Sequence, residues 1–125
     1  MNSSKLKTYN NLFDNITQNF QNETFLNFLY NSQYESISVE QFNDKVFCLA
    51  LALQDLGVKA NDKIAIFSKS SPFWLIFDFA IHQLGAISVP IFANISTYNL
   101  NFEIKDAEVS FIFIDDENRV EDIEE

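Results

Sequence analysis

The sequence predicts an α/β protein, in which an N-terminal helix and a small β-hairpin precede a β-α-β-α-β unit with a parallel sheet. Three short apolar segments, at residues 63–68, 86–91 and 109–114, are separated by patterns with helical periodicity. Strands that are joined through helices in this way run parallel to one another. The first and third segments contain continuous apolar runs, which are typical of strands covered on both faces.

The first 35 residues are expected to form a helix and a hairpin, as the first of three parts of the chain. Apolar residues recur at helical spacing between residues 7 and 20. Residues 24–30 and 36–39 have the composition of two short strands, and the polar turn Asn31-Ser32-Gln33 separates them. This pattern favours an antiparallel hairpin.

The second part, residues 36–115, is expected to be the parallel α/β scaffold, and it begins with a well-marked helix. Ser38-Val-Glu-Gln41 is a capping box, in which each side chain can satisfy a backbone amide at the start of the helix. The helix ends at Gly57, because a left-handed closing residue is least strained without a β-carbon. Cys48 lies off the apolar stripe and is interpreted as an unreactive thiol. The stripe consists of Val39, Phe42, Val46, Leu49, Ala50, Leu53 and Leu56.

A second helix is predicted from Phe73 to Leu84, after the cap Ser71-Pro72. Its apolar residues cover nearly the whole circumference and leave only a narrow polar strip at Asp78 and His82. We interpret these two residues as a surface ion pair that contributes about 0.3 kcal/mol. Catalysis by His82 is disfavoured, because neither a nucleophile nor a pocket is evident beside it.

A helix that is apolar on nearly all sides is expected to pack against more neighbouring elements than one small sheet supplies. The sequence therefore predicts that the helix from Phe73 to Leu84 contacts either the remainder of a larger protein or a second copy of the chain. A shorter helix at residues 98–105 is expected to face the sheet with Leu100, Ile104 and Ala107. Gly85 and Pro90 are interpreted as scaffold residues, at a helix end and in a strand respectively.

Residues 116–125 form the third part, an acidic end that is interpreted as the point where a longer protein is interrupted. Together with Asp115 this run contains seven carboxylates and one arginine. Two structures fit the pattern, a solvated tail or the opening turn of a helix.

Composition excludes several classes of partner. The formal net charge of −10 leaves no basic patch for nucleic acid and disfavours anionic membranes. The longest apolar stretch, residues 73–81, is interrupted by Asp78 and is too short to span a bilayer. The N-terminus has no apolar run suited to a signal peptide, and the single cysteine cannot form an internal disulfide. A cytoplasmic protein is expected.

Four phrases, in order, resemble the N-terminal portion of AMP-forming acyl-CoA synthetases. They are Ile37-Ser-Val-Glu-Gln-Phe42, the linker at residues 56–66, Ser70-Ser-Pro-Phe-Trp74 and Gln83-Leu-Gly-Ala-Ile-Ser-Val-Pro-Ile91. The chain departs from the family pattern at Ala60-Asn61, where proline and glycine are usual, and at Phe73, where an acid is common. The resemblance covers about two-thirds of the chain and implies part of the large N-terminal domain of the adenylate-forming fold.

The resemblance implies a parent enzyme that uses ATP, Mg and coenzyme A, and the phrase at residues 91–96 favours a fatty acid as its substrate. A Ser/Thr/Gly-rich loop holds the ATP phosphates in this family, and no such loop occurs here, because the only glycines are Gly57 and Gly85. We therefore expect no catalytic, cofactor-binding or metal-binding residues in these 125 residues, and no activity of the chain alone. Trp74 could line an acyl tunnel, but core packing is favoured. The alternative is a stand-alone interaction module that kept the scaffold without the enzyme.

Overall fold

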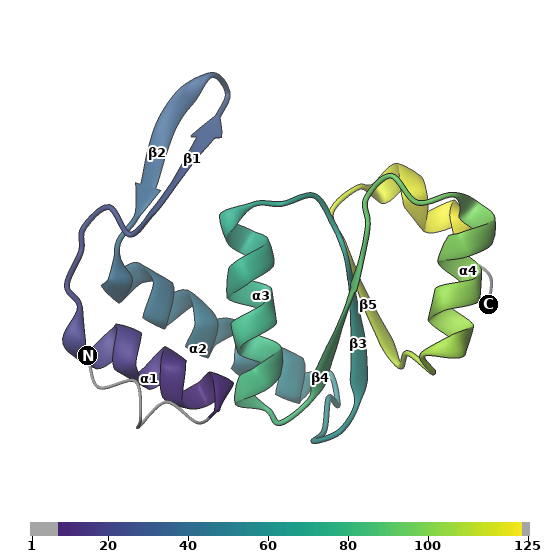
Figure 1. The fold of residues 1–125 in the computed structure, drawn as a ribbon, viewed down its shortest axis with the longest axis horizontal. Helices are drawn as coiled ribbons and strands as arrows, with labels where there is room; N and C mark the ends of the chain where they lie inside the picture. The colour runs from purple at the N-terminus through teal and green to yellow at the C-terminus, as the bar shows by residue number, and fades with distance from the viewer. Residues whose placement is uncertain (1–7, 124–125) are drawn as a thin grey trace.

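The computed structural model describes residues 8–123, and these residues have the α/β architecture that the sequence predicts (Figure 1). The parallel sheet has the strand order β4-β3-β5, and the hairpin forms a separate two-stranded sheet. The helices are α1 (Tyr9–Asn19), α2 (Val39–Asp55), α3 (Pro72–Gln83), α4 (Thr97–Asp106) and the 3-10 helix η2 (Glu117–Asp122). The strands are β1 (Leu26–Tyr30), β2 (Gln33–Ile37), β3 (Lys63–Phe67), β4 (Ile87–Ile91) and β5 (Phe111–Ile114).

The predicted helix boundaries at α2 are confirmed. The Ser38 hydroxyl accepts the backbone N–H of Gln41 at 3.1 Å, and the Gln41 side chain accepts the N–H of Ser38 at 3.0 Å. Gly57, just past the end of the helix, has a φ of +98°. This backbone conformation is strained for any residue that has a side chain. Cys48 is exposed on this helix, away from its buried stripe.

The hairpin is also confirmed, although the predicted limits of its second strand are wrong. Asn31 and Ser32 have φ values of 50° and 65° and form a two-residue turn, so Gln33 already pairs with Tyr30. The strand ends at Ile37 instead of residue 39, because Ser38 turns out of the ladder to cap α2.

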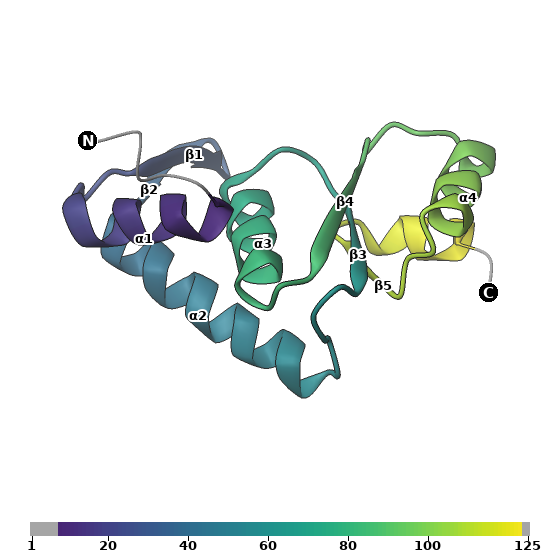
Figure 2. The same cartoon turned by 60° about the horizontal axis from the view of Figure 1, so that its bottom comes forward.

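Helix α3 separates two groups of elements (Figures 1 and 2). On one side it packs on α1 and α2, and on the other it covers one face of the parallel sheet. Helix α4 lies on the opposite face of the sheet, where Leu100 is fully buried. The strands therefore divide their side chains between two cores: Phe111 and Phe113 belong to the core beneath α3, whereas Ile112 and Ile114 belong to the core beneath α4.

The expectation that α3 leaves a bare surface for another domain is wrong. Every residue from Ile76 to Ile81 is buried, and among the apolar residues of α3 only Phe73 is exposed. Helices α1 and α2 together supply the neighbours that the sequence pattern required. Within residues 8–123, no helix combines the length and apolar character needed to cross a bilayer.

Candidate functional site

The carboxyl ends of the three parallel strands meet at one edge of the sheet, which is where open α/β sheets bind their ligands. β3 leads through Ser68 into Lys69, and β5 leads into Asp115. Three cavities of about 510, 230 and 420 Å³ lie along this edge, and Lys69 lines all three. This edge is the candidate site.

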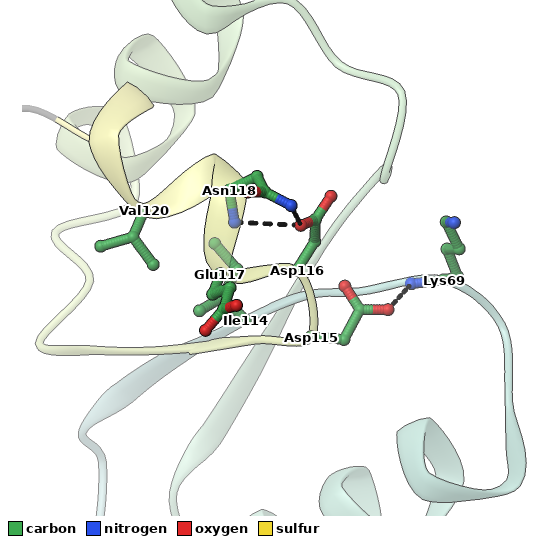
Figure 3. A pocket seen from close by; sticks show the side chains of 7 residues that line it. All are labelled: Lys69, Ile114, Asp115, Asp116, Glu117, Asn118 and Val120. Atoms are coloured by element: carbon green, nitrogen blue, oxygen red, sulfur yellow. Dashed lines mark hydrogen bonds between the residues drawn. The ribbon is translucent and has the colours of Figure 1, made fainter.

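The largest cavity of this edge is bordered by side chains that mainly organise the backbone (Figure 3). Asp115 accepts the backbone N–H of Lys69 at 3.0 Å and so joins the ends of β3 and β5. Asp116 accepts both the backbone N–H and the side-chain amide of Asn118, each at 3.0 Å, and caps η2. The ammonium group of Lys69 points away from the Asp115 carboxylate (Figure 3).

Arg119 fixes the acidic end of the chain against the sheet. Its guanidinium donates to Asp122 Oδ2 at 2.5 Å, to the carbonyl of Ala93 at 3.1 Å and to the carbonyl of Ile95 at 3.0 Å. The same group lies 4.9 Å from the centre of the Phe67 ring, a cation–π arrangement. Within the described residues the solvated tail is therefore wrong, because Glu117–Asp122 forms a 3-10 helix, and residues 124 and 125 of the acidic end lie outside the described part of the chain.

The edge is poorly suited to phosphate. The largest cavity has three carboxylates, Asp115, Asp116 and Glu117, against the single cation Lys69. Both glycines of the chain lie at helix ends instead, each with a positive φ. Among the described residues, no group of three or more His, Cys, Asp or Glu side chains could hold a metal ion.

Trp74 packs against the core beneath α3, as predicted, and its accessible side lines the cavity of about 420 Å³. Pro90 and Phe92 also line this cavity, and Phe92 is 85% exposed. Ser68 lies in this cavity, but its hydroxyl donates to the carbonyl of Lys69 at 3.0 Å. The cavity thus offers apolar contact without an activated nucleophile.

The second polar cluster lies at Asp78, where the predicted pairing with His82 is present but its predicted position at the surface is wrong. Asp78 is only 6% exposed, and its carboxylate accepts the hydroxyl of Tyr9 at 2.5 Å and that of Ser88 at 2.6 Å. His82 Nε2 lies 3.5 Å from the same carboxylate at the margin of the cluster. Because Ser88 binds the carboxylate and not the histidine, the three residues do not form a nucleophile with a general base. The cluster instead fastens α1 and β4 to α3.

The Tyr9 hydroxyl makes the stability contributed by this cluster depend on pH in the alkaline range. Burial, and after it the hydrogen bond and the negative charge of Asp78, raises the pKa of Tyr9. The unfolded chain releases this proton near pH 10, whereas the folded chain retains it. The contribution of Tyr9 is thus fully present below about pH 10 and is lost as the pH rises further.

We expect the free energy of unfolding to fall more steeply above about pH 10 in the native chain than in Tyr9→Phe. Urea titrations between roughly pH 8 and 11 measure this difference. The matched control is Tyr34→Phe, at a ring that is 85% exposed, and it should leave the slope unchanged. Equal slopes in native chain and Tyr9→Phe would contradict the assignment.

Known proteins are similar to this chain in sequence and in fold. The AMP-binding enzyme family matches residues 13–125. The long-chain-fatty-acid–CoA ligase FadD15 of Mycobacterium bovis is 32% identical over 85 residues, which are 68% of this chain and 14% of that protein. An acetyl-coenzyme A synthetase of Mycolicibacterium smegmatis is 33% identical over 81 residues, which are 65% of this chain and 9% of that protein.

Among solved structures, the N-terminal subdomain of Klebsiella oxytoca NpsA matches 90% of this chain and 28% of its own, with a TM-score of 0.76 and 26% identity. The same subdomain in complex with anthranilyl-AMSN matches 97% of this chain and 30% of its own, with a TM-score of 0.79 and 23% identity. The chain thus spans a small part of the length of these relatives, 14% in the case of FadD15. The chain belongs to the AMP-binding enzyme family, and its fold is that of the N-terminal subdomain of adenylate-forming proteins.

Proposed function

We propose that this chain is the N-terminal scaffold of a ligase that joins a carboxylate to ATP, releases pyrophosphate and passes the acyl group to the thiol of coenzyme A. The observation that carries the proposal is the family match over residues 13–125, on a fold shared with adenylate-forming N-terminal subdomains. In this role the chain positions the carboxyl edge of its sheet, and ATP, Mg and coenzyme A bind mainly to residues outside it. The remainder of the enzyme is then its principal partner.

We favour a fatty acid as the substrate and the cytoplasm as the location. Relatives named as long-chain-fatty-acid–CoA ligases support the choice of a fatty acid. An acetyl-coenzyme A synthetase matches at a similar identity, so the choice of acid needs a direct comparison.

The test is carboxylate-dependent exchange of labelled pyrophosphate into ATP, with the longest natural polypeptide that contains these 125 residues. We expect exchange with a long-chain fatty acid, little with acetate and none without acid. Exchange with acetate alone would overturn the choice of substrate, and absence of exchange with any acid would overturn the ligase.

A non-catalytic interaction module is the second candidate, because the sequence contains no glycine-rich loop and because Asp115 and Arg119, at the carboxyl end of the sheet, are already bound to backbone groups. This candidate predicts that the same polypeptide binds a protein partner and neither binds ATP nor exchanges pyrophosphate. A single pair of measurements therefore separates the two.

For the 125-residue chain itself we expect no saturable binding of MgATP below about 1 mM, which corresponds to roughly 4 kcal/mol. The reason is that the candidate site carries excess negative charge and lacks the amide cradle that phosphates need. Titration calorimetry measures it, with a full-length ligase of the family as the positive control. Saturable binding in the micromolar range would contradict this expectation.

A further inference from the structure

Arg119 connects the carboxyl ends of all three parallel strands. It lies on η2, which follows β5, and its guanidinium is 4.9 Å from the ring centre of Phe67, the last residue of β3. The same group donates to the carbonyls of Ala93 and Ile95, in the segment that follows β4. One side chain therefore spans the carboxyl edge of the sheet, from β5 across β3 to β4.

The contacts of this guanidinium require an arginine. Each of its nitrogens has its own acceptor, with Asp122 on Nε and the two carbonyls on the terminal nitrogens. A lysine ammonium is a point charge on a flexible stem, so it cannot bind two carbonyls and lie on an aromatic ring in one fixed plane. The segment itself adds a backbone turn, in which the Ile95 N–H donates to the carbonyl of Phe92 at 3.1 Å. The place of residues 92–95 on the sheet therefore depends on Arg119.

The segment that Arg119 holds borders the cavity of about 420 Å³. Phe92 and Asn94 of the segment line this cavity, together with Trp74 and Pro90. Among the described residues no Asp or Glu lines it, whereas carboxylates line the cavities of about 510 and 230 Å³. Its volume is typical of small-molecule sites, which measure about 300–1,000 Å³. The aromatic rings offer apolar contact, and Lys69, which also lines the cavity, attracts negative charge.

We propose that Arg119 is a positioning residue, which holds residues 92–95 so that the apolar chain of the acid substrate lies against Phe92 and Trp74. The choice of the acid as occupant rests on the proposed function. A fatty acid matches the cavity in both respects, because its chain contacts the rings and its charge is not repelled by a carboxylate of the lining. Arg119 itself does not contact the acid, since it lines the neighbouring cavity of about 230 Å³.

Loosening the segment should weaken binding of the acid, because the apparent affinity falls with the fraction of molecules whose site is complete. Arg119→Gln removes the charge and most of the contacts, whereas Arg119→Lys keeps the charge and loses the planar fork. We expect both variants to raise the Kd for a long-chain acid about tenfold, with unchanged circular dichroism. The control is Lys59→Gln, which removes one positive charge ahead of β3, at the opposite end of the sheet.

The measurement is quenching of tryptophan fluorescence by a long-chain fatty acid that carries bromine along its chain, because bromine quenches a ring only at close contact. It uses the longest natural polypeptide that contains these 125 residues, and the emission that is lost in Trp74→Phe is assigned to Trp74. We expect saturable quenching of this emission in the native polypeptide and in Lys59→Gln with the same Kd, and the higher Kd in both Arg119 variants. The same acid without bromine should not quench.

Two results would overturn the proposal. If the Trp74 emission is not quenched in the native polypeptide, the acid does not lie at this cavity. If the folded Arg119 variants bind with the native Kd, Arg119 does not position the segment. Should the Arg119 variants fail to fold, Asp122→Ala, which removes only the acceptor of Nε, decides in their place, with an expected rise in Kd of about threefold.

Pyrophosphate exchange on the same polypeptide separates this inference from the proposed function. Exchange with a long-chain acid, without quenching of Trp74, would refute the inference and leave the ligase. Quenching without exchange would refute the ligase and leave the binding site that Arg119 positions.

Discussion

Replacing Phe42 by alanine is expected to lower the free energy of unfolding by about 3–5 kcal/mol, the cost of removing a buried phenylalanine. The ring is fully buried at the place where three parts of the chain meet. Its centre lies 5.9 Å from that of Phe13 in α1, 5.3 Å from that of Phe25 before the hairpin and 5.5 Å from that of Phe79 in α3. Because these rings come from separate elements, the surroundings cannot easily collapse into the cavity.

Urea unfolding measures the loss, with Trp74, the only tryptophan, as the fluorescent probe in α3. Leu51→Ala is the control on the same helix, because Leu51 is 61% exposed and its removal should change stability by no more than about 0.5 kcal/mol. A loss below about 2 kcal/mol in Phe42→Ala would mean that the three elements repack around the smaller side chain.

Asp78→Ala should destabilise the chain by about 3 kcal/mol, because it leaves two buried or half-buried hydroxyls without their acceptor. Asp78→Asn keeps one acceptor oxygen and should lose less, about 1–2 kcal/mol. In a double-mutant cycle, Tyr9→Phe should cost little once Asp78 is alanine, because the interaction that it removes is already absent.

Urea unfolding at neutral pH measures the three variants. Additive effects of the Asp78→Ala and Tyr9→Phe substitutions would show that the hydrogen bond between Tyr9 and Asp78 contributes no stability.

Local signals in the sequence accounted for most of the fold. The capping box at Ser38, the glycine at Gly57 and the apolar runs of β3 and β5 each act within a few residues, so their structural consequence does not depend on the rest of the chain. The hairpin could also be predicted from local sequence, but its register could not. The polar composition indicated a turn of three residues, whereas the turn has two, Asn31 and Ser32.

The errors concern contacts between residues far apart in the sequence. A helical wheel shows that Asp78 and His82 share a face, but it cannot show that Tyr9, 69 positions earlier, buries that face. For the same reason, the sequence could not show that α1 packs on α3 and covers its apolar surface. At the candidate site, Arg119 was the single cation in an acidic run, and its role became clear only from the carbonyls of Ala93 and Ile95 that it binds.

The central position of α3 also bears on how the chain is made. Phe42 and Phe13 emerge from the ribosome long before Phe79, the ring that completes their cluster. Translation at about 5–20 residues per second leaves that apolar cluster incomplete for seconds, even though α1, the hairpin and α2 have been synthesised. We therefore expect nascent chains that end before α3 to be the species most readily bound by chaperones, and release from them to follow once α3 has left the ribosome.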